Sequence, residues 1–426
     1  MVFWCFMVWM FVLLARPQDV FVSLESFHPS LTIALICLLM IVATTSAQQW
    51  KSIWQHSETK TYLLFYVVMI LGIPFAYHRR VAFEYIFFLD LMNLLFFIAF
   101  VLMMTSTERL KKGIILLVYV SLFYSVFGLA YGTFREGRFF VNGSMFDPND
   151  MAYLLVSLLP FCVFCLLIEA GWINRLVSIA AAVTSVTLIL YTGSRTGVIG
   201  LAAIGILLLC TKVVPIKAAS KFGMVASFLV VLVLIQDRVN IDRYLSLTNV
   251  ENDYNSTSES GRIGIWKRSY DLILENPITG VGVGCFPMAI GYLRGQEGVL
   301  PQWQAAHNSY ILVAAETGVI GFLIYLTNIV RCLRSFVQAT RSHIMSDPSH
   351  FLRIVAGLLE VGFIAHLICA FFLTQGYSLL FPLYFAFSAV VRAMKTNCDQ
   401  PKAPSCVPMQ HSSLDLKRII NRNAIR

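Results

Sequence analysis

Residues 81–104 read VAFEYIFFLDLMNLLFFIAFVLMM, and this stretch decides the class of fold. Its apolar side chains run on without alternation, and Glu84 and Asp90 are the only charged residues in it. About 20 predominantly apolar residues form a helix that crosses the bilayer, whereas a spanning β-strand alternates apolar and polar residues. The stretch therefore predicts a transmembrane helix.

The rest of the chain has the same character. Of its 426 residues, 58% are hydrophobic and 13% are charged, and the mean hydropathy is +0.73. Soluble domains carry about 25% charged residues, so most of this chain must have lipid as its solvent. This composition excludes a cytosolic enzyme, a disordered chain and a secreted disulfide scaffold.

Continuous apolar runs predict about 12 transmembrane helices in an all-α polytopic membrane protein. The predicted spans are Val2–Leu14, Leu31–Ala47, Tyr62–Tyr77, Val81–Met104, Gly113–Ala130, Met151–Ile168, Trp172–Tyr191, Thr196–Cys210, Ala218–Ile235, Tyr310–Val330, Ile354–Leu373 and Tyr377–Val391.

The spans divide the chain into four parts. Residues 1–235 hold the first nine helices, and residues 236–306 form one large loop that contains short helices. Residues 307–395 hold the last three helices, and residues 396–426 form a basic tail. Such a tail beside anionic lipid favours an electrostatic contact with the membrane.

Lys and Arg are enriched in cytoplasmic loops, and their distribution predicts that both termini are cytoplasmic and that the large loop faces outward. The short inner loops then carry Lys51, Lys60, Arg109, Lys111, Lys112, Arg175, Lys212, Lys217, Lys221, Arg331, Arg334, Arg341 and Arg353. Arg79 and Arg80 break this rule on the outer side. Much of the formal net charge of +9 therefore orients the chain, and the sequence predicts no nucleic-acid partner.

Three outward-facing side chains suit a substrate with an anionic leaving group. Arg195 joins two apolar spans with almost no loop between them, and Arg262 starts an amphipathic helix predicted over Arg262–Glu275. His307 opens the tenth span. Arg binds phosphate through charge-assisted hydrogen bonds, and a neutral imidazole removes a proton from a hydroxyl. We predict these three as catalytic residues.

Two other polar segments leave alternatives open. Asp147 and Asp150 suit either a divalent cation or a helix start with a capping residue, and the second fits better. The glycine run Gly280–Gly284 lacks the spacing and the preceding strand of a nucleotide loop, so a tight backbone turn is favoured over a phosphate cradle.

An ordered set of motifs resembles the O-antigen ligase and O-antigen polymerase superfamily. His307-Asn308 is followed after nine residues by Gly318 and then Gly321. The other recurrent pieces are, in chain order, Asp147-Pro-Asn149, Ser194-Arg195-Thr-Gly197, Ser260-Gly-Arg262 with Trp266, and Gly280-Val-Gly-Val-Gly-Cys-Phe286.

The resemblance implies a GT-C-like, metal-independent glycosyltransferase without a cofactor, on the periplasmic face of a Gram-negative inner membrane. It would move a glycan from undecaprenyl diphosphate to a hydroxyl of lipid A–core oligosaccharide during lipopolysaccharide assembly, as an O-antigen ligase does. Arg195 and Arg262 match the positions that hold the diphosphate, and His307 matches the base. Asn308, Asn149 and Trp266 are expected to bind substrate, and no metal is expected.

Other functions remain open at this stage. The HN element is shared by the ligases, the polymerases and the protein O-oligosaccharyltransferases of the superfamily. Twelve spans also suit a transporter, although the loop divides the chain unequally and the charged candidates lie at one face. A metal-dependent transferase would use Asp147 and Asp150.

Overall fold

The computed structural model describes residues 1–135, 137–141, 147–168, 170–210, 212–238, 244, 258, 261–341 and 347–399. Ser260 of the predicted motif and residues 400–426 of the predicted tail lie outside the described residues. The described part is almost wholly helical, so the predicted all-α polytopic class is confirmed.

The α-helices are α1 (Val2–Ala15), α2 (Pro17–Val20), α3 (Pro29–Thr44), α4 (Ala47–Ile53), α5 (Ser57–Gly72), α6 (Arg79–Glu84), α7 (Leu91–Met103), α8 (Thr107–Tyr131), α9 (Pro148–Leu158), α10 (Phe164–Leu167), α11 (Gly171–Tyr191), α12 (Arg195–Cys210), α13 (Ala218–Ile235), α16 (Arg262–Glu275), α17 (Phe286–Gln296), α18 (Ser309–Thr340), α19 (Asp347–Ala370) and α20 (Leu380–Asp399). Short 3-10 or π-helical turns are η1 (Val22–Phe27), η2 (Ile73–Phe75), η3 (Tyr85–Asp90), η4 (Leu159–Val163) and η5 (Gln236–Arg238). Two strands, β1 (Thr133–Arg135) and β2 (Arg138–Phe140), pair antiparallel in a hairpin between α8 and α9.

Each predicted span falls on helical structure, but the spans differ in length. Among the described residues, eight helices are long and apolar enough to cross a membrane. The predicted spans at α1 and α12 are shorter apolar helices of 14 and 16 residues, and α20 is not among the eight.

The predicted second span is a bent pair of helices rather than one straight helix. Helices α3 and α4 meet at an angle of 114°. Ser46 starts α4 with a reciprocal capping box, in which its hydroxyl accepts from the Gln49 amide and Gln49 accepts from the Ser46 amide. A capping box favours a new helix start, so the chain turns there.

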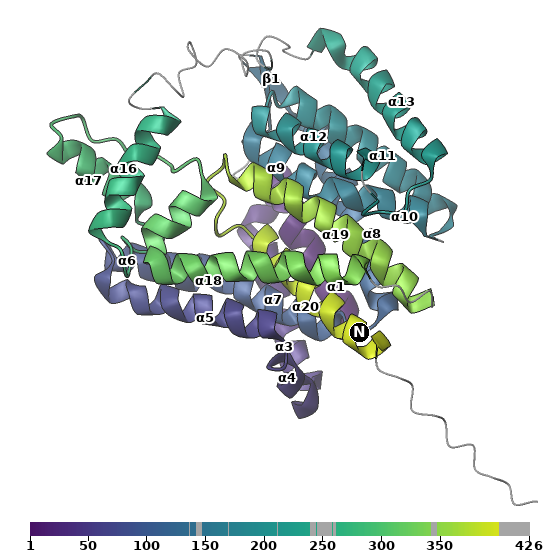
Figure 1. Ribbon diagram of the computed structural model, residues 1–426, viewed down its shortest axis with the longest axis horizontal. Coiled ribbons are helices and arrows are strands. Elements are labelled where there is room, and N and C mark those ends of the chain that lie inside the picture. The colour runs from purple at the N-terminus through teal and green to yellow at the C-terminus, as the bar shows by residue number, and fades with distance from the viewer. Residues whose placement is uncertain are drawn as a thin grey trace, which may run out of the picture.

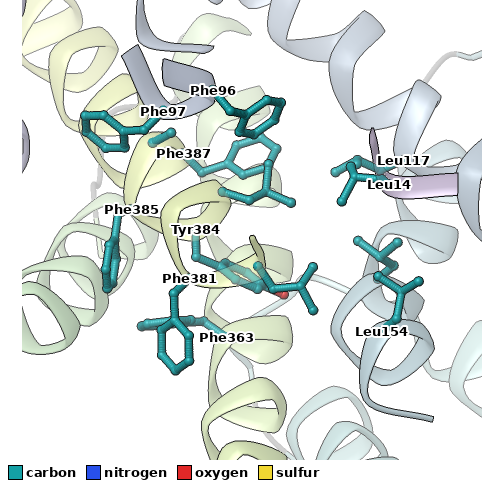
Figure 2. Packing of buried hydrophobic residues seen from close by; sticks show 14 of the residues in the cluster. Leu14, Phe96, Phe97, Leu117, Leu154, Phe363, Phe381, Tyr384, Phe385 and Phe387 are labelled. Atoms are coloured by element: carbon teal, nitrogen blue, oxygen red, sulfur yellow. The ribbon is translucent and has the colours of Figure 1, made fainter. Parts of the chain in front are cut away.

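Aromatic packing joins the central helices. Phe96 and Phe97 of α7, Phe363 of α19 and Phe381 and Tyr384 of α20 are buried together (Figure 2). The rings of Phe363 and Tyr384 lie 4.9 Å apart between centroids. Lipid is as apolar as these side chains, so their shape complementarity rather than escape from water holds the helices in register.

One imidazole is buried in this core. His366 is fully buried, and its two ring nitrogens lie 3.2 Å from the Tyr153 hydroxyl and 3.1 Å from the Ser157 hydroxyl. A buried polar group with both hydrogen-bonding positions filled is a structural element of the bundle.

Helix α18 is broken at Gly318, and the glycine-rich loop fills the break. Gly318 has φ 65° and ψ −173°, outside helical geometry. The amides of Val281 and Gly282 donate to the carbonyls of Ala315 and Glu316 at 2.8 and 3.0 Å. These bonds satisfy carbonyls that the break leaves without helical partners, and the run Gly280–Gly284 thus acts as a backbone turn against α18.

Two further hydrogen bonds, one to a backbone carbonyl and one to a carboxylate, hold the loop against the break in α18. The Val319 amide donates to the Pro277 carbonyl at 2.8 Å, and the Phe286 amide donates to Glu316 Oε1 at 3.0 Å. Figure 1 shows the result: α16 and α17 lie together at the end of the molecule where α6 lies, beyond the left end of α18.

Gly318→Ala tests the packing of the glycine-rich loop against the break in α18. The φ/ψ region of Gly318 is almost exclusive to glycine, and an added Cβ would lie 2.3 Å from the Ile278 carbonyl oxygen. We expect a loss of roughly 1–3 kcal/mol in stability, measured by thermal unfolding in detergent. Gly205→Ala, where an added Cβ meets open space, is the control and should unfold at or above the wild-type temperature. Equal unfolding temperatures for both variants would contradict this account of the break.

Candidate functional site

His307 lies at the junction between the loop and α18. Its backbone is left-handed, with φ 47°, a conformation that non-glycine residues adopt uncommonly. The His307 amide donates to Thr374 Oγ1 at 2.8 Å, and the residue is partly open to solvent. The next residue, Asn308, is 2% exposed and caps α18, because its Oδ1 accepts from the amides of Tyr310 and Ile311. The cap fixes the helix start and therefore the place of His307.

The segment between α19 and α20 holds this junction against α9. Ser309 Oγ donates to the Leu373 carbonyl at 2.7 Å and accepts from the Gln375 amide at 3.0 Å. The Gln375 side chain in turn donates to Asp150 Oδ1 at 2.8 Å. Thr374 and Gln375 position the site but were not predicted, since nothing in their local sequence marks contacts with residues so distant in the chain.

Helix α16 brings Arg262 and Trp266 to the same junction. The Trp266 indole Nε1 donates to the Ala306 carbonyl at 2.9 Å, directly before His307, and its ring packs edge-on against Phe371. Arg262 is the first residue of α16 and is half-buried. The Arg262 guanidinium is close enough to His307 to act on its charge.

The start of α9 meets the turn that carries Arg195. Asp147 caps α9 through its Oδ1, which accepts from the Asn149 amide at 2.8 Å. Ser194 Oγ donates to Asn149 Oδ1 at 3.0 Å, so α9 holds the turn directly before Arg195. Gly197 permits this approach, because an added Cβ there would lie 2.8 Å from the Ala152 Cβ. Arg195 is half-buried at the first position of α12.

Arg138, which the sequence did not single out, lies beside this turn. Its Nη2 donates to Asn149 Oδ1 at 3.1 Å and its Nε donates to the Thr192 carbonyl at 3.2 Å. Asn149 thus connects the hairpin arginine and the Ser194 turn through one oxygen atom. The sequence feature that marks Arg138 is its place in a predicted outer loop, directly before two aromatic residues, Phe139 and Phe140.

The electrostatics of the site favour a neutral imidazole. Partial burial and the Arg262 guanidinium lower the pKa of His307 below its usual value near 6.5, and the Asp147 carboxylate opposes this effect. The imidazole is therefore largely unprotonated at neutral pH and is able to accept a proton.

The predicted residues fall into two groups that share the start of α9. Arg262, Trp266, His307 and Asn308 lie at the junction of α16 and α18, and Asn149 and Arg195 lie at the junction of α9 and α12. Asp147 connects the groups, because it caps α9 and acts on the charge of His307. The catalytic and substrate-binding assignments themselves stay predictions.

The acidic residues of this region have protein partners. Asp147 accepts from a backbone amide, and Asp150 accepts from Gln375. Among the described residues, no three His, Cys, Asp or Glu side chains are grouped so that they could hold a metal ion.

Part of the chain matches a known protein family. Residues 180–326 match the family model described as O-Antigen ligase, and this region contains Arg195, Arg262 and His307. No curated protein matches the chain. Proteins of the matched family are membrane enzymes of the glycosyltransferase type, which supports a transferase activity in this multi-pass membrane protein. Residues 180–326 are therefore similar to the O-antigen ligase family, and this similarity supports a member of the O-antigen ligase and O-antigen polymerase superfamily.

Proposed function

We propose that this protein is an O-antigen ligase. It transfers a glycan from undecaprenyl diphosphate to a hydroxyl of lipid A–core oligosaccharide, at the periplasmic face of a Gram-negative inner membrane, during lipopolysaccharide assembly. The observation that carries the proposal is the bond from Trp266 Nε1 to the Ala306 carbonyl, which brings α16, the helix that Arg262 starts, to the residue directly before His307. Arg262 and His307 both lie inside the matched region. A general base beside a fixed cation is the combination that glycosyl transfer from a diphosphate requires.

The proposed reaction is a single displacement at the anomeric carbon of the donor glycan. His307 takes the proton of the acceptor hydroxyl while the hydroxyl oxygen forms the new bond to that carbon. The bond from that carbon to the diphosphate oxygen breaks, and undecaprenyl diphosphate leaves with the electron pair. Arg195 and Arg262 stabilise the negative charge that develops on the leaving group.

The surroundings of His307 suit both the neutral imidazole that accepts the proton and the imidazolium that forms. Partial burial and then Arg262 lower the pKa of the free imidazole and so keep it neutral before the reaction. A bound diphosphate offsets the Arg262 charge, which raises the basicity of the imidazole when the donor is present. Asp147 then stabilises the imidazolium that forms.

Replacing the base and the cations tests the proposal. Purified protein in detergent with EDTA should transfer a lipid-linked glycan to lipid A–core, and His307→Ala should lower the rate by roughly 10²–10⁴-fold, the usual contribution of general base catalysis. Arg195→Ala and Arg262→Ala should also lose transfer, at unchanged expression. Lys267→Ala is the control, because Lys267 is an exposed cation on the same helix as Arg262.

The assay includes acceptors that separate the members of the superfamily. Lipid A–core, a second lipid-linked glycan and a peptide are supplied in parallel, because the family match does not distinguish ligase, polymerase and protein O-oligosaccharyltransferase. Absence of transfer to lipid A–core would refute the ligase, and transfer to one of the other acceptors would identify the alternative. Loss of all transfer with EDTA would refute metal independence.

The pH dependence of transfer tests His307 separately. Since the pKa of His307 is lowered, the acid limb of kcat/KM should lie below pH 6.5. Asp147→Asn keeps a capping side chain but removes the charge that raises the pKa of His307, so the acid limb should move to lower pH. Lys267→Gln should leave the limb in place. A limb that Asp147→Asn leaves unmoved, or moves to higher pH, would contradict the assignment.

A further inference from the structure

The helices that carry the candidate site frame a basic cavity at their other ends. Helix α12 starts at Arg195, and Lys212 lies two residues after its last residue, Cys210; Arg341 caps the C-terminus of α18. Arg353 lies near the start of α19, whose far end leads to Thr374. At about 1.5 Å per residue, α12 extends roughly 24 Å and α19 extends roughly 26 Å from Arg353 to its end, close to the ~30 Å thickness of the hydrocarbon. The cavity and the site thus lie at opposite membrane faces.

The cavity is large enough for a headgroup. Its volume is about 460 Å³, and the three cations Lys212, Arg341 and Arg353 line it together with Thr340 and Glu360. One glycine brings its walls together: a Cβ added at Gly357 of α19 would lie 2.6 Å from the Val213 carbonyl oxygen. The segment after α12 therefore packs directly on the backbone of α19, and this contact places Lys212 in the same cavity as Arg353.

The cavity has an excess of positive charge and a buried donor. Among the described lining residues, three cations face one carboxylate, Glu360, which accepts from the Thr340 hydroxyl at 3.4 Å. Arg353 Nε is buried and has no hydrogen-bond partner among the described residues. A buried donor without an acceptor costs free energy, and an anion in the cavity would satisfy it.

The surroundings of the cavity are those of a lipid-facing surface. Helix α13 exposes large apolar side chains along its length, among them Phe222, Leu229 and Leu234. The Lys221 ammonium donates to the Leu209 carbonyl at 2.6 Å, which ties the start of α13 to the end of α12 beside Lys212. A surface for acyl chains therefore begins next to the cations.

We propose that this cavity binds the phosphodiester headgroup of an anionic phospholipid, at the membrane face opposite the candidate active site. The guanidinium groups of Arg341 and Arg353 bind the phosphate oxygens, Lys212 adds a third charge, and the acyl chains lie along α13. Basic pockets between transmembrane helices on the cytoplasmic side bind anionic headgroups in this way. The site is independent of the transfer reaction.

Lipid binding to the purified full-length chain tests the proposal. Native mass spectrometry of the protein in detergent is titrated with phosphatidylglycerol, with phosphatidylcholine and with phosphatidylglycerol in the presence of inorganic phosphate. Phosphatidylglycerol should bind at least about tenfold more tightly than phosphatidylcholine, as expected for one charge-assisted contact. Equal binding of both lipids would overturn the proposal, and displacement by an equal concentration of inorganic phosphate would overturn the lipid assignment.

Variants locate the site within the molecule. Arg341→Gln combined with Arg353→Gln should weaken phosphatidylglycerol binding by about tenfold or more, while Lys51→Gln, at an exposed cation of α4 outside the cavity, should bind as the wild type does. Glu360→Gln removes the only carboxylate among the described lining residues of the cavity and should tighten binding, an effect that misfolding does not produce. Unchanged binding in the double variant, or unchanged or weaker binding in Glu360→Gln, would overturn the proposal.

Discussion

The join between the glycine-rich loop and the break in α18 fixes the relative positions of the proposed catalytic groups. Arg262 stands at the start of α16, before the loop, and His307 stands at the start of α18, after it. The amides of Val281 and Gly282 bond to carbonyls at the break, and the Phe286 amide bonds to Glu316. Because these bonds involve mainly backbone, they set the position of the loop helices without depending on mobile side chains, and the Trp266 bond to Ala306 completes the placement.

The second constraint is the start of α9, where segments far apart in the chain converge. Asp147 acts on the charge of His307, Asn149 holds the turn before Arg195, and Asp150 is held by Gln375. The start of α9 thus has contacts with both the turn before Arg195 and the junction that carries His307 and Arg262. This is a suitable environment for an anionic leaving group and a hydroxyl nucleophile, and it is built on helices rather than on the loop alone.

The membrane architecture was predictable because the length of an apolar run shows directly whether a helix can span the bilayer. Arg195 stood out because a charged residue between two apolar spans is unusual. Arg262 stood out because it starts an amphipathic helix in the large loop, and His307 because it opens a span at the same predicted face. Thr374 and Arg138 did not, since their roles come from hydrogen bonds to residues more than 50 positions away. The bend between α3 and α4 had a local signal, the Ser46–Gln49 capping box, which lies at the end of the apolar run. The break at Gly318 likewise depends on a loop that closes on it from another part of the chain.

Titration of the His307 imidazole shows whether this residue is a neutral base whose pKa responds to burial, to Arg262 and to the donor diphosphate. Protein with isotope-labelled histidine is followed by NMR as a function of pH, and His307→Gln assigns the resonance. We expect a pKa for His307 below 6.5 in the free protein and a rise when undecaprenyl diphosphate binds. A pKa at or above 6.5 that the lipid diphosphate does not change would show that His307 is not this base.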